Sequence, residues 1–445
     1  MFKRFLIIAA FAPSIAFGAD DCATMRNVPD SVQSLQDIIN LGLCRNPQTA
    51  AAYASLRSAH FNKNAGYSKY LPGVSARVGA NKNFAQSDDV KNKDYDWKYS
   101  ASISASYLIF DFGKRTSDFA QTLAAYRAAG LDYDETVQNF IYGLVGAYYE
   151  LLNADADVKS AESALTVAQT AKDTADKKFK AGAVAKADVY KAETTLASSQ
   201  LSLERAKNNR EIIKGTLLTK LSFPANQEIK IADMPSNFGS ETESESIDEL
   251  IKIAREKRPD LLKASANKDA AWHKRNSAFL QNLPKIEASA GVSWNDNSIG
   301  DVFAPETNKM NGSIGITASM PIFAGFANMY GLRAAESDFT RAKYNEQQTV
   351  NAAMMDVFTA YQNYKTAQTV LKHAESLLKS ATESERVTAG MYKVGRATML
   401  DWQTAQSELV NAQKQNNSAK YDLFIKRAAV ALAIGDIKSE IEGEQ

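Results

Sequence analysis

The 445-residue sequence has no marked excess of either charge and very little histidine. Its net charge of +1 lacks the basic excess typical of nucleic-acid-binding proteins, so we expect no nucleic-acid partner. His60, His273 and His373 are far apart, and neither an HExxH motif nor a GxSxG, GxGxxG or P-loop motif occurs. We therefore predict no catalytic residues, no metal and no cofactor. A hydrolase without a recognisable motif is the weakest hypothesis.

Beyond its start, the sequence has no stretch of the ~20 apolar residues that a membrane helix needs. The start itself, MFKRFLIIAAFAPSIAFGAD, is basic, then apolar, and contains Ala16-Phe17-Gly18. This pattern predicts a signal peptide at residues 1–18 and an exported mature chain without a helical anchor. Because Asp20 and Asp21 stand before the first cysteine, we expect no lipidated N-terminus.

Cysteine is also scarce: only Cys22 and Cys44 occur, and both remain after cleavage. In an oxidising compartment such a pair is expected to form a disulfide, which would fasten the N-terminal segment to the first helix. Two unpaired thiols are the alternative.

Proline is absent between Pro72 and Pro224 and again after Pro321. Since proline inside a helix costs ~3 kcal/mol, its absence permits long uninterrupted helices. A helix of 66 residues would be a rod of roughly 100 Å. We expect long helices at 113–178 and 325–390, return helices at 186–221 and 397–433, and first helices of about 35 residues near 33–70 and 246–282.

The sequence repeats itself at an offset of 212 or 213 residues. LQDIINLGLCRNP at 35–47 matches IDELIKIAREKRP at 247–259, and KFKAGAVAKADVYKAETTL matches MYKVGRATMLDWQTAQSEL. This register predicts an internal duplication. After the signal peptide we expect a first repeat at 19–240 and a second at 241–435. Their tips lie near 179–188 and 390–401, and a tail follows at 436–445.

Alanine occupies every second position of a heptad seam in both long helices, which predicts closely packed coiled coils. The charged and polar remainder would suit the wall of a water-filled tube. A plain two-stranded rod is the alternative. The seam residues are Leu151, Ala154, Val158, Ala161, Leu165, Ala168 and Ala175, then Tyr364, Ala367, Leu371, Ala374, Leu378 and Ala381.

Four segments alternate with a period of two and are predicted strands: 73–84, 97–110, 285–294 and 312–322. In WKYSASISASY, at 97–107, one set of side chains is apolar and the other is almost entirely serine. Strands that are apolar outward and small and polar inward are typical of a transmembrane barrel. A soluble sandwich would not place serine and glycine in its core. Aromatic residues at the strand ends suit the interfacial belts: Phe84, Trp97, Trp294, Tyr107, Phe110 and Phe323. The polar connections 85–96 and 295–311 are expected to be the outward loops.

Four strands cannot close a barrel, and an open edge is not tolerated in lipid. We therefore expect a homotrimer, in which three chains supply twelve strands around a channel.

The sequence resembles the TolC family of outer-membrane channel-tunnels in three features. These are the internal duplication, the Leu-Pro before the first strand of each repeat, and the tip motifs AGAVAKAD and VGRATMLD. The early cysteines, with Cys44 in GLCRNPQT, are similar to members that serve type I secretion. The resemblance implies an α+β membrane protein: a trimeric twelve-stranded outer-membrane barrel, continued through the periplasm by an α-helical coiled-coil barrel.

The resemblance to this family further implies contact with outer-membrane lipid. It also implies docking onto a periplasmic adaptor protein and an inner-membrane transporter. The expected function is the exit duct of an efflux pump or type I secretion system in a Gram-negative bacterium, for small molecules or polypeptides. A periplasmic coiled-coil scaffold without channel activity is the alternative.

The tips are the predicted docking site, because glycine and small neighbours let backbones approach closely. The candidates are Gly182, Ala183, Val184, Gly395 and Arg396. A simple helix-ending turn with glycine near its C-cap is the alternative.

A gate is predicted just beyond the tips. Asp188 and Asp401 would bring six carboxylates towards one axis in a trimer, and cations such as Lys186, Arg396 or bound metal ions would compensate them. We expect Arg396 and Tyr392 to tie a closed state to acidic groups of neighbouring helices, with Asp401 lining the constriction. The alternative is that each carboxylate only offsets a helix dipole.

Three positions depart from the family pattern. Ala324 and Thr404 stand where many members have aspartate, and Ala397 stands where they often have the arginine. We therefore expect milder cation block than in members with both acidic residues.

Overall fold

The computed structural model describes residues 27–84, 95–232, 246–297 and 309–437. The predicted signal peptide, Cys22, most of both outward loops and nearly all of the tail lie outside these ranges. The chain divides into two units. The strand unit comprises Ala52–Asp134 and Pro259–Ala352, and the tip unit comprises the remainder. Each unit contains segments from both halves of the sequence, so the units do not coincide with the predicted repeats.

The first helix of each half is two helices, and the prediction of one continuous helix is wrong. The first half has α2 (Leu35–Arg45) and α3 (Pro47–Gly66), and the second has α6 (Ile247–Lys257) and α7 (Pro259–Leu280). The residues between them, Asn46 and Arg258, are extended, with ψ of 124° and 120°. The ring of a following proline disfavours helical backbone at the preceding residue, and proline itself is well placed to begin the next helix.

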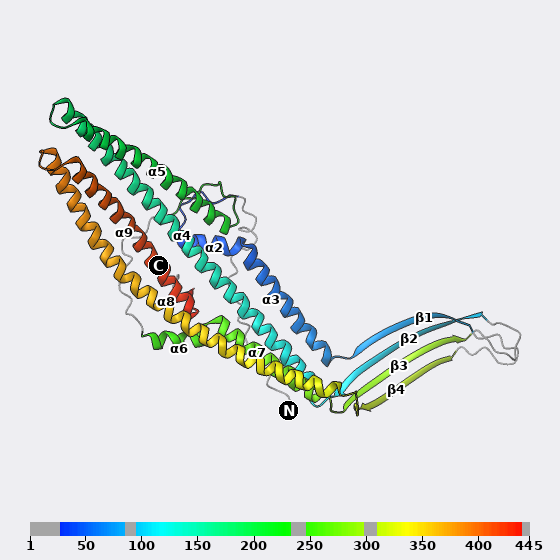
Figure 1. Ribbon diagram of the computed structural model, residues 1–445. Helices are drawn as coiled ribbons and strands as arrows, with labels where there is room; N and C mark the ends of the chain where they lie inside the picture. Colours follow the sequence, from blue (N-terminus) through cyan, green and yellow to red (C-terminus); the bar gives the residue numbers. More distant parts are fainter. Residues whose placement is uncertain (1–26, 85–94, 233–245, 298–308, 438–445) are drawn as a thin grey trace, which may run out of the picture. The chain divides into compact units, whose positions relative to one another are not determined.

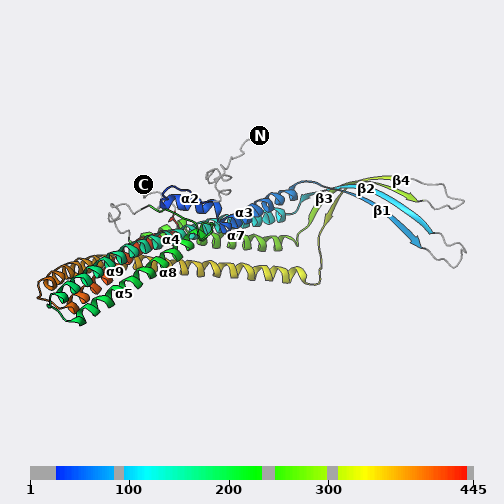
Figure 2. The same ribbon diagram turned by 90° about the horizontal axis from the view of Figure 1, so that it is seen from above.

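The strand unit contains one sheet in the order β1-β2-β3-β4, with every neighbouring pair antiparallel. The four strands lie side by side in both views (Figures 1 and 2). A short 3-10 helix, Tyr67–Tyr70, precedes β1. The strands are β1 (Gly73–Phe84), β2 (Tyr95–Phe110), β3 (Lys285–Asn297) and β4 (Lys309–Ser319). The last strand ends earlier than predicted, before Pro321, a residue that cannot donate to a strand ladder.

The register separates apolar from small polar side chains, as predicted. Ile103 of β2 lies between Ala76 of β1 and Val292 of β3, whereas Ser104 lies between Ser75 and Gly291. The apolar face is exposed in this chain: the exposed fraction is 85% for Val78 and 92% for Ile314. On the opposite face the hydroxyls of Ser75 and Ser104 are hydrogen-bonded at 2.9 Å. The sheet therefore has one surface suited to lipid and one suited to water.

The long helices form two hairpins. The first is α4 (Lys114–Lys180) and α5 (Lys186–Lys220), and the second is α8 (Ala327–Lys393) and α9 (Met399–Ile434). The predicted alanine seam is buried within the tip unit, with Ala168 and Ala175 fully inaccessible. Small side chains at these positions let neighbouring helices approach closely. No helix in the described ranges combines the length and the apolar composition that a membrane-spanning helix requires.

In the tip unit, α2 packs closely against α4 and α5. A Cβ on Gly42 would lie 2.6 Å from Cδ1 of Leu144, so only glycine fits there without displacement. Leu217 and Leu221 of this core are fully buried. Cys44 lies on α2 and takes part in a disulfide. Its pairing with Cys22 stays a prediction, because Cys22 is outside the described ranges.

Candidate functional site: the two helical tips

The two hairpins of the tip unit, α4–α5 and α8–α9, end in turns of the same construction at the same end of this unit (Figure 1). Gly182 and Gly395 have φ of 71° and 80°, a backbone conformation that favours glycine. In the first turn the N–H of Ala183 donates to the carbonyl of Lys178 at 2.8 Å. In the second, the N–H of Arg396 donates to that of Met391, also at 2.8 Å. Both turns are Schellman caps, which supply partners to the last carbonyls of a helix.

Below the turns, one buried cluster joins helices from both halves. It contains Ala171, Ala175, Val189, Ala192, Tyr392, Met399 and Trp402. The rings of Tyr392 and Trp402 lie 5.3 Å apart, and the indole N–H of Trp402 donates to Glu385 at 2.8 Å. The indole is therefore buried with its polar atom satisfied, which fixes α9 against α8.

Lys178, in the last turn of α4, connects the two hairpins. Its ammonium donates to the carbonyl of Tyr392 and lies 4.2 Å from the centroid of that residue's ring. A cation is stabilised both at a helix C-terminus and over an aromatic face, and Tyr392 supplies both near the end of α8.

Tyr392 is only 2% exposed, and its hydroxyl has no hydrogen-bond partner among the described residues. Burial raises the pKa of its phenol, and the negative charge of Asp188 raises it further. The phenol therefore stays neutral. The predicted tie from Tyr392 to an acidic group of a neighbouring helix remains a prediction.

Asp401 forms a capping box with Thr398 at the start of α9. Its carboxylate accepts the Thr398 hydroxyl at 2.7 Å and the Thr398 backbone N–H at 2.8 Å. In return, the Asp401 N–H donates to the threonine hydroxyl at 3.2 Å. The bonds from Thr398 hold the pKa of the Asp401 carboxyl below its ordinary value. This is a more specific helix-capping role than the dipole effect considered from the sequence, and it leaves the predicted gate role untested.

The first tip is less tightly capped. Asp188 lies in the first turn of α5, whose N-cap residue, Ala185, offers no side-chain hydrogen bond. In the described part of the chain, the carboxylate of Asp188 forms a long ion pair with Lys191, at 3.9 Å. The ammonium of Lys186 lies 5.4 Å from the ring centroid of Tyr190. The carboxylate of Asp188 is thus freer than that of Asp401 to meet an external cation.

The predicted docking residues lie at the surface of the tips. Gly182, Ala183, Gly395 and Arg396 are exposed, and Val184 is partly exposed. Two neighbouring apolar side chains are also exposed, Val394 at 73% and Leu400 at 58%. The sequence reasoning missed Lys178. The repeat alignment shows only that the two tips differ in charge at this position, because Lys178 corresponds to Met391; it does not predict the contact with Tyr392.

Comparison with known proteins agrees with this architecture. The family model "Outer membrane efflux protein" matches residues 38–221 and 250–436. Protein CyaE of Bordetella pertussis is 22% identical over 416 residues, covering 92% of this chain and 86% of its own. The outer membrane protein TolC of Escherichia coli is 22% identical over 424 residues, covering 92% and 83%.

Solved structures share the fold. The outer-membrane channel OprN superposes with a TM-score of 0.79 at 20% identity, covering 94% of this chain and 95% of its own. VceC from Vibrio cholerae gives a TM-score of 0.78 at 18% identity, covering 90% and 96%.

Proposed function

Because this chain belongs to the outer membrane efflux protein family, we propose that it forms the outer-membrane exit duct of an efflux or type I secretion assembly in a Gram-negative bacterium. The observation that carries this proposal is the four-stranded sheet with one exposed apolar face and one serine and glycine face. Such a sheet separates lipid from water only when it forms the wall of a pore.

The sheet has two open edges in this chain, β1 and β4. Unpaired backbone groups cost several kcal/mol each in hydrocarbon, so these edges need strands from other copies. We propose a homotrimer in which β4 of one chain pairs with β1 of the next. Crosslinking in mild detergent should give trimers. Monomers and dimers alone would contradict this arrangement.

The tips would dock a periplasmic adaptor protein, which links the duct to an inner-membrane transporter. The exposed small and apolar residues around Gly182 and Gly395 support this assignment. The names of relatives include "Toxin and drug export protein A" and "Pyoverdine export outer membrane protein OpmQ". Relatives are therefore named for the export of both toxins and small molecules. We propose that the partners, rather than the duct, select the cargo.

The family consists of outer membrane channel proteins. We propose that this chain has no catalytic activity and acts only as a passage.

Single-channel recording in a planar bilayer tests the function directly. The purified protein should require detergent for solubility and should insert to give discrete conductance steps. A periplasmic scaffold would remain soluble without detergent and give none, and that result would overturn the proposal.

A further inference from the structure

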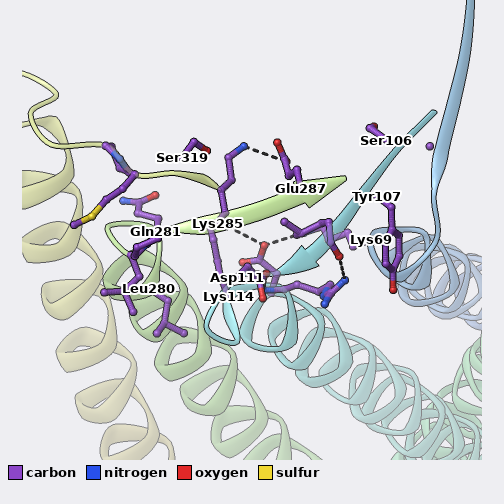
Figure 3. Close-up of a pocket in the computed structure, with 18 of the residues that line it drawn as sticks. Lys69, Ser106, Tyr107, Asp111, Lys114, Leu280, Gln281, Lys285, Glu287 and Ser319 are labelled. Atoms are coloured by element: carbon purple, nitrogen blue, oxygen red, sulfur yellow. Dashed lines mark hydrogen bonds and ion pairs between the residues drawn. The ribbon is translucent and has the colours of Figure 1, made fainter. Parts of the chain in front are cut away.

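A cavity of the strand unit lies where its strands meet its helices. Its volume is 680 Å³, within the roughly 300–1,000 Å³ range of small-molecule sites. Both halves of the sequence line it: β1, β2 and the start of α4 from the first, the end of α7, β3 and the segment after β4 from the second. Figure 3 shows Lys69, Lys114, Lys285 and Leu280 around this cavity.

Two lysines of the cavity share a single carboxylate. The ammonium of Lys69 lies 3.1 Å from Oδ2 of Asp118, and that of Lys114 lies 3.0 Å from the same oxygen. The other carboxylate oxygen, Oδ1, accepts the hydroxyl of Ser277. Burial alone would raise the pKa of Asp118, but the bonds from Ser277, Lys114 and Lys69 outweigh it and lower the pKa. One fixed negative charge therefore faces two positive charges.

The other charged side chains that line the cavity do not provide a second negative charge for Lys69 and Lys114. Asp111 is buried, and its carboxylate accepts the backbone N–H groups of Gly113 at 3.2 Å and Arg115 at 2.6 Å. The guanidinium of Arg115 donates to the carbonyl of Leu108 at 2.8 Å. Lys285 and Glu287 pair with each other at 3.2 Å (Figure 3). Four cationic and three anionic side chains line the cavity, so one positive charge is unbalanced.

Each lysine also has spare hydrogen-bonding capacity. An ammonium carries three donors, and the bond to Asp118 uses one of them. The side chains of Lys69 and Lys114 are 51% and 36% exposed, so both remain accessible from the cavity. A second anionic group would relieve the repulsion between the two ammonium groups.

Beside these charges the wall of the cavity is apolar. Its apolar residues include Leu71, Leu280, Leu283, Pro284, Met320 and Pro321. An inorganic anion would leave this surface in contact with water, whereas an alkyl chain would cover it.

We propose that this cavity binds an amphipathic anion, with a phosphate or carboxylate head on Lys69 and Lys114 and an apolar chain along the leucines. The ligand could be a membrane lipid or a soluble amphiphile, since both present the same chemistry. The site belongs to the strand unit alone and does not depend on the proposed duct function.

Calorimetric titration of the full-length protein in a non-ionic amphipol tests this site with three probes: dodecyl phosphate, inorganic phosphate and neutral dodecyl maltoside. We expect dodecyl phosphate to bind at least about tenfold more tightly than either of the others. If inorganic phosphate binds as tightly as dodecyl phosphate, the apolar wall does not contribute to binding. If dodecyl maltoside binds as tightly as dodecyl phosphate, the lysines do not contribute. Either result would overturn the proposal. Competition by phosphatidylglycerol vesicles, but not by vesicles of phosphatidylcholine, would identify a lipid source. Binding of dodecyl phosphate without such competition would identify a soluble amphiphile.

Substitutions distinguish binding in this cavity from a general effect of the protein's charge on anion binding. Lys69→Gln and Lys114→Gln should each weaken binding about tenfold, the loss expected for one charge-assisted hydrogen bond. Lys114→Arg should retain it. Lys274→Gln is the matched control, because Lys274 lies in the same unit, is 53% exposed and pairs with Asp338 outside the cavity. Asp118→Asn removes the competing carboxylate and should strengthen binding. Equal weakening by the control, or unchanged affinity in both lysine variants, would overturn the proposal.

Discussion

Thr398 and Asp401 fix the first turn of α9 by exchanging hydrogen bonds, and this pair can be tested residue by residue. Thr398→Ala removes the acceptor for the Asp401 N–H. Loss of such an N-cap costs ~1 kcal/mol, so local opening should increase about fivefold. Hydrogen exchange of the amides of Asp401 and Trp402, which donate to Thr398, should accelerate by that factor. Thr398→Ser keeps the hydroxyl and should exchange at the wild-type rate. Unchanged protection in the alanine variant would contradict the cap.

The same pair predicts a pH dependence. The pKa of Asp401 is lower in the folded chain than its ordinary value of 3.8. The stabilisation of the first turn of α9 by the ionised Asp401 carboxylate is therefore fully present above about pH 3.8. It is lost as the pH falls through the lower pKa of the folded chain. The protection factors of the Asp401 and Trp402 amides should be constant from about pH 7 to pH 5 and decrease only below about pH 3.8. Asp401→Asn should remove this decrease. An equal decrease in that variant would assign the effect to another group.

Lys178 is the residue whose role is least visible in the sequence. It contacts the carbonyl and the ring of Tyr392, a partner 214 positions away. Lys178→Met removes the cation from the end of α8 but keeps most of the side-chain volume. Since a charge at a helix terminus contributes ~0.3–1 kcal/mol, exchange at 390–393 should accelerate about two- to fivefold. Lys180→Met removes an exposed lysine of the same turn and should have no effect. Equal acceleration by both variants would indicate only a change in net charge.

At the level of elements, local patterns predicted the strands well and the helix breaks poorly. The period of two over residues 73–84 gives the bounds of β1 without error, because pleated alternation is a strictly local property. Pro47 and Pro259 were visible in the sequence, yet their effect on the preceding residue was overlooked. The contact of Lys178 with Tyr392 could not be predicted, because it depends on how hairpins from the two halves pack together.

The glycine turns give an element-scale prediction. Gly182 and Gly395 have positive φ, where an L-residue costs roughly 1–2 kcal/mol, and a Cβ at either would meet only open space. Leucine at either position should strain the turn and block close approach of an adaptor, abolishing export while trimers and conductance persist. Gly390→Leu is the control, because Gly390 is helical and also faces open space. Normal export by both tip variants would exclude docking there.

At the level of the whole assembly, three copies of each tip would converge on one axis. Two aspartates per chain then place six carboxylates near a constriction, where their repulsion favours an open state unless cations compensate it. The structure gives Asp401 a local partner in Thr398, whereas the carboxylate of Asp188 lies 3.9 Å from the ammonium of Lys191. Arg396 is exposed at the tip, and we propose that it pairs with an acidic group of an adjacent copy. An exposed ion pair contributes ~1 kcal/mol or less, a tie weak enough for an adaptor to break.

Two substitutions test this gate in planar bilayers. Asp401→Asn should reduce cation selectivity and divalent block, because it removes three of the six charges while the side chain can still accept from Thr398. Arg396→Ser should raise the resting conductance, because it removes the proposed tie between copies. Lys180→Met serves as a charge control for the second variant. If both variants keep wild-type conductance and selectivity, Asp401 acts only as the cap of α9, and the closed state must depend on the contacts below the turns, with Lys178 and Tyr392 the first residues to test.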